Sequence, residues 1–110
     1  MSQYKTMQRL AFRMKLHPGQ EEEYKRRHDA IFPELVQLLK ETGISDYSIY
    51  LDKESLYLFG ILQVEDPIKM NELPHHPVMK KWWAYMKDIM DCNPDNSPIS
   101  IPLQQVFHLN

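Results

Sequence analysis

His28 and Tyr24 are the residues whose types and spacing best suit chemistry in this sequence. They stand four residues apart, so on a helix both side chains leave the same face. The apolar residues around them place that face toward the core, where a polar group needs a hydrogen-bond partner or a cavity. Because an imidazole titrates near neutral pH, His28 could give and take protons in a pocket between helix and sheet. The alternative is a structural histidine whose hydrogen bonds are satisfied in the core.

Trp82 and Trp83 form the second such feature. Neighbouring side chains on a helix point about 100° apart, so one indole can pack in the core while the other lines a pocket. We place Trp83 on the buried stripe, with the methionines at 79, 86 and 90, and Trp82 beside it. The pair could form a platform for the apolar face of a sugar or another flat ring. Two bulky core residues are the alternative.

The remaining candidate motifs predict little chemistry. His75 and His76 are adjacent, and no H-x-x-x-H or H-E-x-x-H spacing exists, so we expect no metal site. Three glycines and no G-x-G-x-x-G pattern leave no basis for a phosphate-binding loop. The single cysteine, Cys92, excludes an internal disulfide, and we expect it to be a structural thiol rather than a nucleophile.

Charge restricts the classes of partner. Thirteen Lys and Arg against fifteen Asp and Glu give a formal net charge of −2, so no basic excess favours nucleic acid. We expect the ion pairs Glu22–Arg26 and Glu23–Arg27 on a solvated helix face. A neutral small molecule fits this balance better than a strongly anionic one.

Length and hydropathy predict a single domain over residues 1–110, with 1–6 as a loose N-terminal extension. No apolar run approaches the roughly 20 residues that cross a bilayer, so no membrane partner is expected. No basic start precedes an apolar stretch of the kind found in secretory signals. Together with the lone cysteine, these features fit a cytoplasmic location.

The elements that must position the candidate residues follow from hydrophobic periodicity. Apolar side chains alternate from Leu10 to Leu16, which predicts a strand. The acidic run at 21–23 begins a helix whose apolar stripe recurs every three or four residues. Pro33 should kink this helix or split it near residues 31–32, and Gly43 is a suitable stop.

In the second half of the chain, the pattern first predicts two strands, at 47–51 and 56–62. A helical stretch at 66–73, ended by Pro74, and a helix that begins at Pro77 follow them. A loop at 93–98 then leads to a last strand at about 103–109. The complete order is β-α-β-β-α-β, the ferredoxin-like split arrangement of the α+β class. The strand at 56–62 is apolar on both faces. We therefore expect helices to cover one face and a second subunit the other, which gives a homodimer built as a dimeric α+β barrel.

Four segments resemble the L-rhamnose mutarotase family: RRHDAIFPEL at 26–35, YSIYLD at 47–52, WWAYMKDIM at 82–90 and NPDNSP at 93–98. The resemblance runs in order from about Arg9 to Leu109. It implies a dimeric α+β barrel that interconverts the α and β anomers of L-rhamnose, or of a closely related 6-deoxysugar, without metal or organic cofactor. Phe32 stands where the family's usual tryptophan is expected, and residues 66–78 match no family pattern.

The resemblance also implies roles for single residues. His28 would be the proton donor, and Tyr24, Tyr47, Trp82 and Trp83 would contact the sugar. Anomer exchange needs a proton delivered to the ring oxygen and another removed from the anomeric hydroxyl, and ring closure reverses both transfers. A second group or an ordered water would supply the base.

Two other function classes are compatible with the same fold. One comprises the cofactor-independent or haem-handling monooxygenases of the dimeric α+β barrel superfamily, which would need an extended aromatic or porphyrin cavity. The other is a ligand-binding dimer without catalytic activity. Anomer exchange on L-rhamnose separates both from a mutarotase.

Overall fold

The computed structural model describes residues 7–110, and the predicted extension at 1–6 lies outside them. The elements are β1 (Gln8–Lys15), α1 (Glu21–Asp29), α2 (Pro33–Glu41), β2 (Ile44–Leu51), β3 (Tyr57–Val64), the 3₁₀ helix η1 (Pro67–His75), α3 (Pro77–Met86) and β4 (Ile101–Leu103). Two helical connections, α1–α2 and η1–α3, separate the strands. The order β-α-β-β-α-β and the α+β class are therefore confirmed.

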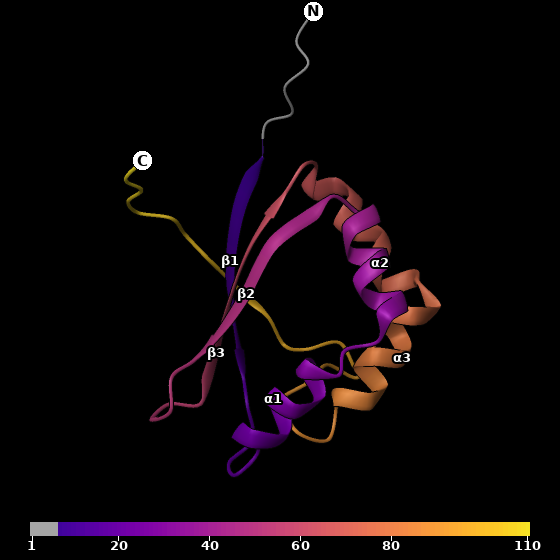
Figure 1. Ribbon diagram of the computed structural model, residues 1–110. Coiled ribbons are helices and arrows are strands. Elements are labelled where there is room, and N and C mark those ends of the chain that lie inside the picture. Colours follow the sequence, from indigo (N-terminus) through magenta and orange to yellow (C-terminus); the bar gives the residue numbers. More distant parts are fainter. Residues whose placement is uncertain (1–6) are drawn as a thin grey trace, which may run out of the picture.

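The strands form one antiparallel sheet in the order β2-β3-β1-β4. The helices all lie on one face of this sheet, and among residues 7–110 no helix or strand covers the other face (Figure 1). The central strands β1 and β3 pair along their whole length, from Gln8 opposite Val64 to Lys15 opposite Tyr57. β2 and β4 form the two edges.

Pro33 splits the first helical connection, as predicted. α1 ends at Asp29, and Pro33 occupies the first turn of α2, where its missing N–H costs no helical hydrogen bond. α2 ends at Glu41, followed by Gly43 with a φ of +89°, the left-handed conformation typical of a helix stop. The chain turns between the two helices just after His28.

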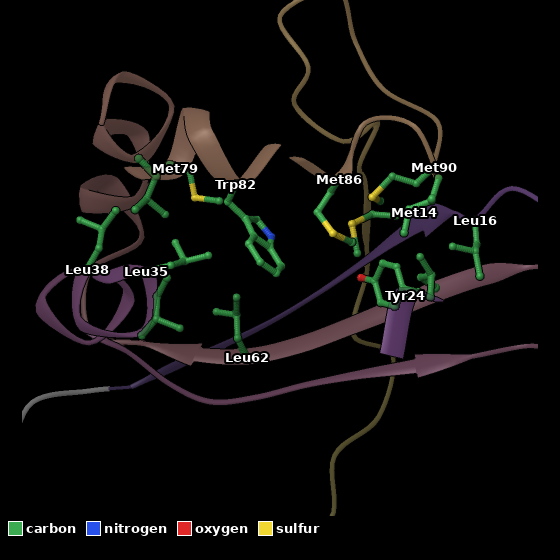
Figure 2. Close-up of a cluster of buried hydrophobic side chains, with 14 of the residues drawn as sticks. Met14, Leu16, Tyr24, Leu35, Leu38, Leu62, Met79, Trp82, Met86 and Met90 are labelled. Carbon is green, nitrogen blue, oxygen red and sulfur yellow. The ribbon is translucent and has the colours of Figure 1, made fainter. Parts of the chain in front are cut away.

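The core lies between the sheet and the helices, where Figure 2 shows its side chains interdigitating. β3 contributes Leu58, Leu62 and Val64 from one of its two faces, and these residues are almost completely buried. The alternate residues Tyr57, Phe59 and Ile61 point to the uncovered face, so this strand is apolar on both sides. The helices supply the other half of the core.

The predicted stripe of α3 is wrong in one respect. The helix buries Met79, Trp82 and Met86, whereas Trp83 is only half-buried. Each tryptophan is three or four residues from both Met79 and Met86, so spacing alone cannot decide which of the two is buried. The helix also ends at Met86, which leaves Met90 in the turns that follow it.

Two other predicted boundaries differ from the structure. The helical stretch that should end before Pro74 is a 3₁₀ helix that runs through it to His75. The last strand is at Ile101–Leu103, not at 103–109, because only residues 101–103 pair with β1. Residues 104–110 make no strand pairing with any part of the chain that the structure describes. Within residues 7–110 the longest helix has ten residues, too short to cross a bilayer.

Candidate active site

A cavity of about 1120 Å³ opens between the sheet and the helices, beside the packed core. All five candidate residues line it: His28 and Tyr24 from α1, Tyr47 from β2, and Trp82 and Trp83 from α3. Residues distant in sequence thus meet at one site. The volume is ample for a monosaccharide, since small-molecule sites usually measure about 300–1,000 Å³.

The imidazole of His28 is oriented by its own helix. Its Nδ1 lies 3.0 Å from the backbone oxygen of Tyr24, and because a carbonyl can only accept, Nδ1 carries the proton. The ring stacks on Tyr24 with centroids 4.2 Å apart and meets the Trp82 indole edge-on at 5.2 Å. Nε2 has no hydrogen-bond partner among residues 7–110. It is therefore the nitrogen available to a ligand in the cavity.

Burial sets the protonation state of His28. Removal from water lowers the pKa of His28, and the hydrogen bond to Tyr24 and the charge of Asp29 only partly oppose this shift. At neutral pH the ring is therefore neutral, with a lone pair on Nε2. A proton that it gains during a reaction is readily given up again.

The Tyr24 side chain is buried beside the cavity. Burial, and then the nearby phenol of Tyr47, raise the pKa of Tyr24 well above its ordinary value. Its hydroxyl thus stays protonated and can both donate and accept a hydrogen bond. In Figure 2 this hydroxyl and the indole of Trp82 point into the same space above Leu62.

A bulge in β2 directs Tyr47 to the cavity. The register shifts between Ser45 and Ser48, and Asp46 adopts a φ of +51°, as expected where an extra residue enters a strand. Tyr47 lies against Phe12 of β1, with ring centroids 6.1 Å apart, on the helix side of the sheet. Tyr47 is 39% exposed, and the burial of its hydroxyl among protein atoms raises its pKa to about 12.

Trp82 and Trp83 have different places on the cavity wall. Trp82 is 6% exposed and joins an aromatic cluster in which Phe32 approaches it at 5.0 Å and Tyr85 at 5.8 Å. Trp83 is half-buried and lines the cavity without belonging to that cluster. Both indoles therefore line the cavity, and Trp82, not Trp83 as predicted, is the one that is also part of the core.

Arg27 is a residue whose importance the sequence analysis missed. Its guanidinium donates to the backbone oxygen of Tyr85 at 2.7 Å, to Asp88 at 2.8 Å and to Glu23 at 2.7 Å, and it lies over the Tyr85 ring. The side chain is only 10% exposed, so the expectation of a solvated helix face is wrong here. Arg27 instead fastens α1, and with it His28, to α3.

The other predicted ion pairs hold in part. Glu23 pairs with Arg27 as expected, but Arg26 also binds Glu23 rather than Glu22, at 2.8 Å. These two arginines hold the pKa of Glu23 at about 2, with the hydrogen bond from Arg26 as the larger cause.

Among residues 7–110, no three His, Cys, Asp or Glu side chains gather as a metal site requires.

Comparison with known proteins identifies the family. The family model of the L-rhamnose mutarotases matches residues 9–109. An L-rhamnose mutarotase from Brucella anthropi is 62% identical over 94% of this chain and 98% of its own length. One from Sinorhizobium fredii is 61% identical over 94% of this chain and 100% of its own.

Similar solved structures include a member of the same family. The crystal structure of an L-rhamnose mutarotase from Formosa agariphila superposes with a TM-score of 0.88 at 50% identity, covering 94% of this chain and 99% of its own. A protein from Bacteroides thetaiotaomicron, named as an antibiotic biosynthesis monooxygenase, superposes at 0.59 with 14% identity, covering 93% of this chain and 91% of its own. That second likeness shows a common fold alone. The chain belongs to the L-rhamnose mutarotase family.

Proposed function

We propose that this protein interconverts the α and β anomers of L-rhamnose, or of a closely related 6-deoxysugar, by acid–base opening and closure of the sugar ring. The observation that carries the proposal is the meeting of His28, two phenols and two indoles at one cavity, in a chain of this family. No second function is favoured by a feature of the site.

Proton transfer at the ring oxygen is the task of His28. Because His28 is neutral at rest, its Nε2 first takes up a proton from water. As the imidazolium, it then donates this proton to the ring oxygen while the bond from that oxygen to the anomeric carbon breaks. The anomeric hydroxyl loses its proton to a base, which an ordered water can provide, and the open aldehyde forms. After rotation about the bond next to the aldehyde, the ring oxygen adds to the other face and both protons return. Positioned acid–base catalysis of this kind contributes typically about 10²–10⁴-fold.

The other cavity residues bind the sugar. Tyr24 and Tyr47 keep their protons at neutral pH, so each can donate to one sugar oxygen and accept from another hydroxyl. The Trp82 and Trp83 indoles supply apolar surface for the C–H face of the ring and the methyl group of a 6-deoxysugar. This arrangement needs neither a metal ion nor an organic cofactor.

The active form is proposed to be a homodimer. The face of the sheet away from the helices exposes Tyr50, Ile61, Ile101 and Leu103, which lie on three different strands. Stacking this face on a second copy would bury them. We also place the enzyme in the cytoplasm, in keeping with its single free thiol, Cys92.

Saturation-transfer NMR on L-rhamnose tests the activity. Saturating the anomeric proton of one anomer should reduce the signal of the other only when the protein is present, and equally in EDTA. An unrelated protein of similar size serves as the control for buffer catalysis. Exchange at the rate of buffer alone, with a folded protein, would overturn the proposed activity.

A further inference from the structure

Opening of the sugar ring releases one proton that has no assigned acceptor among the side chains, and this inference rests on the proposed function. The anomeric hydroxyl must lose that proton to a base as the aldehyde forms. Tyr24 and Tyr47 keep their own protons at neutral pH, so neither phenol is such a base. A carboxylate only accepts hydrogen bonds and protons, which is the chemistry that this step needs.

Among residues 7–110, four acidic side chains line the cavity: Glu21, Glu22, Asp29 and Asp46. The last three are exposed, so water competes for hydrogen bonds to their carboxylates. Asp29 is also bound by Lys25, at 2.9 Å. Glu21 differs from them because it is half-buried and its Oε1 is shielded from water by the protein.

The buried oxygen of Glu21 has no hydrogen-bond partner within residues 7–110. A carboxylate oxygen in that state costs free energy, and a hydroxyl bound beside it would remove the cost. The other buried side-chain atom without a partner among these residues is Nε of Arg13, which does not line the cavity. The acceptor that lacks a donor at the cavity wall is therefore Oε1 of Glu21.

A favourable charge at the start of α1 does not account for this burial. Acidic side chains in the first turn of a helix are stabilising even when water surrounds them. Glu23, in the same turn, has its carboxylate satisfied by hydrogen bonds from Arg26 and Arg27. Glu21 has a buried oxygen that neither water nor an arginine reaches, which suits an acceptor kept for a ligand.

Glu21 also lies on the face of α1 that carries the proposed acid. Glu21, Tyr24 and His28 follow one another at spacings of three and four residues, so their side chains leave one face. Glu21 and His28 are two turns apart, about 10.5 Å along the helix axis. The imidazole stacks on the Tyr24 ring with centroids 4.2 Å apart, so it turns back over the intervening turn. With a hydrogen bond of about 2.8 Å at each end, the remaining gap suits the ring oxygen and anomeric hydroxyl of one sugar.

We propose that Oε1 of Glu21 is the base that takes the proton of the anomeric hydroxyl while His28 protonates the ring oxygen. The O–H electron pair becomes the carbonyl bond of the aldehyde as the bond between the anomeric carbon and the ring oxygen breaks. After the aldehyde rotates, Glu21 returns its proton to the carbonyl oxygen, and the ring oxygen returns its proton to His28 as it adds to the other face. Both residues end in the state in which they began, and no co-reactant is needed.

Two substitutions at Glu21 test this assignment by saturation-transfer NMR at several L-rhamnose concentrations. Glu21→Gln keeps the size of the side chain but cannot take up the proton, so kcat should fall about 10²-fold while KM changes by less than about twofold. Glu21→Ala leaves space for a small carboxylate, so formate should restore part of its kcat in proportion to the formate concentration. Formate should not restore Glu21→Gln, whose amide fills that space, and exchange caused by formate without protein is subtracted.

Glu34→Gln is the matched control, because Glu34 is an exposed acid in the first turn of α2 and does not line the cavity. It should keep the wild-type kcat. Thermal unfolding of the same variants separates catalysis from structure. Since the buried Oε1 lacks a partner, Glu21→Gln should unfold at a temperature no lower than Glu34→Gln does.

Three results would overturn the proposal. They are a kcat of Glu21→Gln within about twofold of the wild type, with or without a higher KM, no rescue of Glu21→Ala by formate, and a loss of kcat that only follows a loss of folded protein. Absence of exchange with the wild-type protein would instead refute the proposed function itself, so the two failures are distinguishable.

Discussion

His28 combines an orientation imposed by its own helix with a protonation state imposed by burial. The Tyr24 carbonyl fixes which nitrogen carries the proton, and the cavity receives the other nitrogen. A structural histidine would use both nitrogens for internal hydrogen bonds. Within residues 7–110, Nε2 makes none, which favours the functional interpretation.

Replacing His28 by Ala should reduce kcat/KM for anomer exchange about 10²-fold or more while the fold persists. Tyr24→Phe should act more weakly, because it removes one hydroxyl but keeps the ring that stacks on His28. Exchange NMR and thermal unfolding on the same variants measure both effects. A destabilised His28→Ala protein with wild-type turnover would mean that the acid lies elsewhere, and Tyr47 would be examined first.

His28 should also make stability depend on pH. Its folded pKa is lower than its unfolded pKa, so the unfolded chain binds more protons as the pH falls through about 6.5. The stability of the wild type should therefore decrease between about pH 7 and 5 more than that of His28→Asn. Urea denaturation at three pH values in this range measures the difference. Parallel decreases in the two proteins would assign the effect to the other histidines.

At the scale of elements, Arg27 determines how α1 sits against α3. Asp88 is exposed to water and Glu23 is half-buried, so water screens both ion pairs, and the hydrogen bond to the Tyr85 backbone carbonyl joins α1 directly to α3. Arg27→Ala should cost about 1–3 kcal/mol of unfolding free energy and raise KM. Arg26→Ala, on the exposed side of the same helix, is the matched control and should change little. Equal costs in denaturant melts would contradict this role.

The sheet has its own packing constraint at Gly60. A Cβ there would stand 2.4 Å from the Phe12 ring, which in turn contacts Tyr47. Gly60→Ala should cost about 1–3 kcal/mol. Phe12→Leu should recover part of this cost in the double variant, because it removes the clashing ring. Full additivity in a double-mutant cycle would show that the two residues act independently.

At the scale of the whole molecule, one uncovered apolar sheet face predicts assembly. Sedimentation equilibrium at micromolar concentration should give twice the chain mass of 13.2 kDa. Ile61→Asp, in the centre of that face, should shift the protein toward monomer. Ile68→Asp is the control, since Ile68 is exposed on η1, away from the sheet. A wild-type species of 13.2 kDa alone would exclude the homodimer.

Much of this architecture follows from the sequence because it depends on local interactions. The two-residue alternation of β1, the split at Pro33, the stop at Gly43 and the start of α3 at Pro77 depend on neighbours within a few residues. The pairing of His28 with Tyr24 on one helix face has the same origin. The resemblance to the family then indicated which residues should contact the sugar, and these residues line the cavity.

Contacts between segments that are distant in the sequence determine the features that local patterns do not predict. The bulge that aims Tyr47 into the cavity depends on how β2 registers with β3, and the end of β4 depends on how far β1 can pair with it. Trp82 rather than Trp83 is buried because the aromatic side chains of Phe32 and Tyr85 pack on it. Arg27 is fastened to α3 because Tyr85 and Asp88 stand opposite it. Periodicity reports which face of an element is apolar, but only tertiary packing determines which side chain meets which.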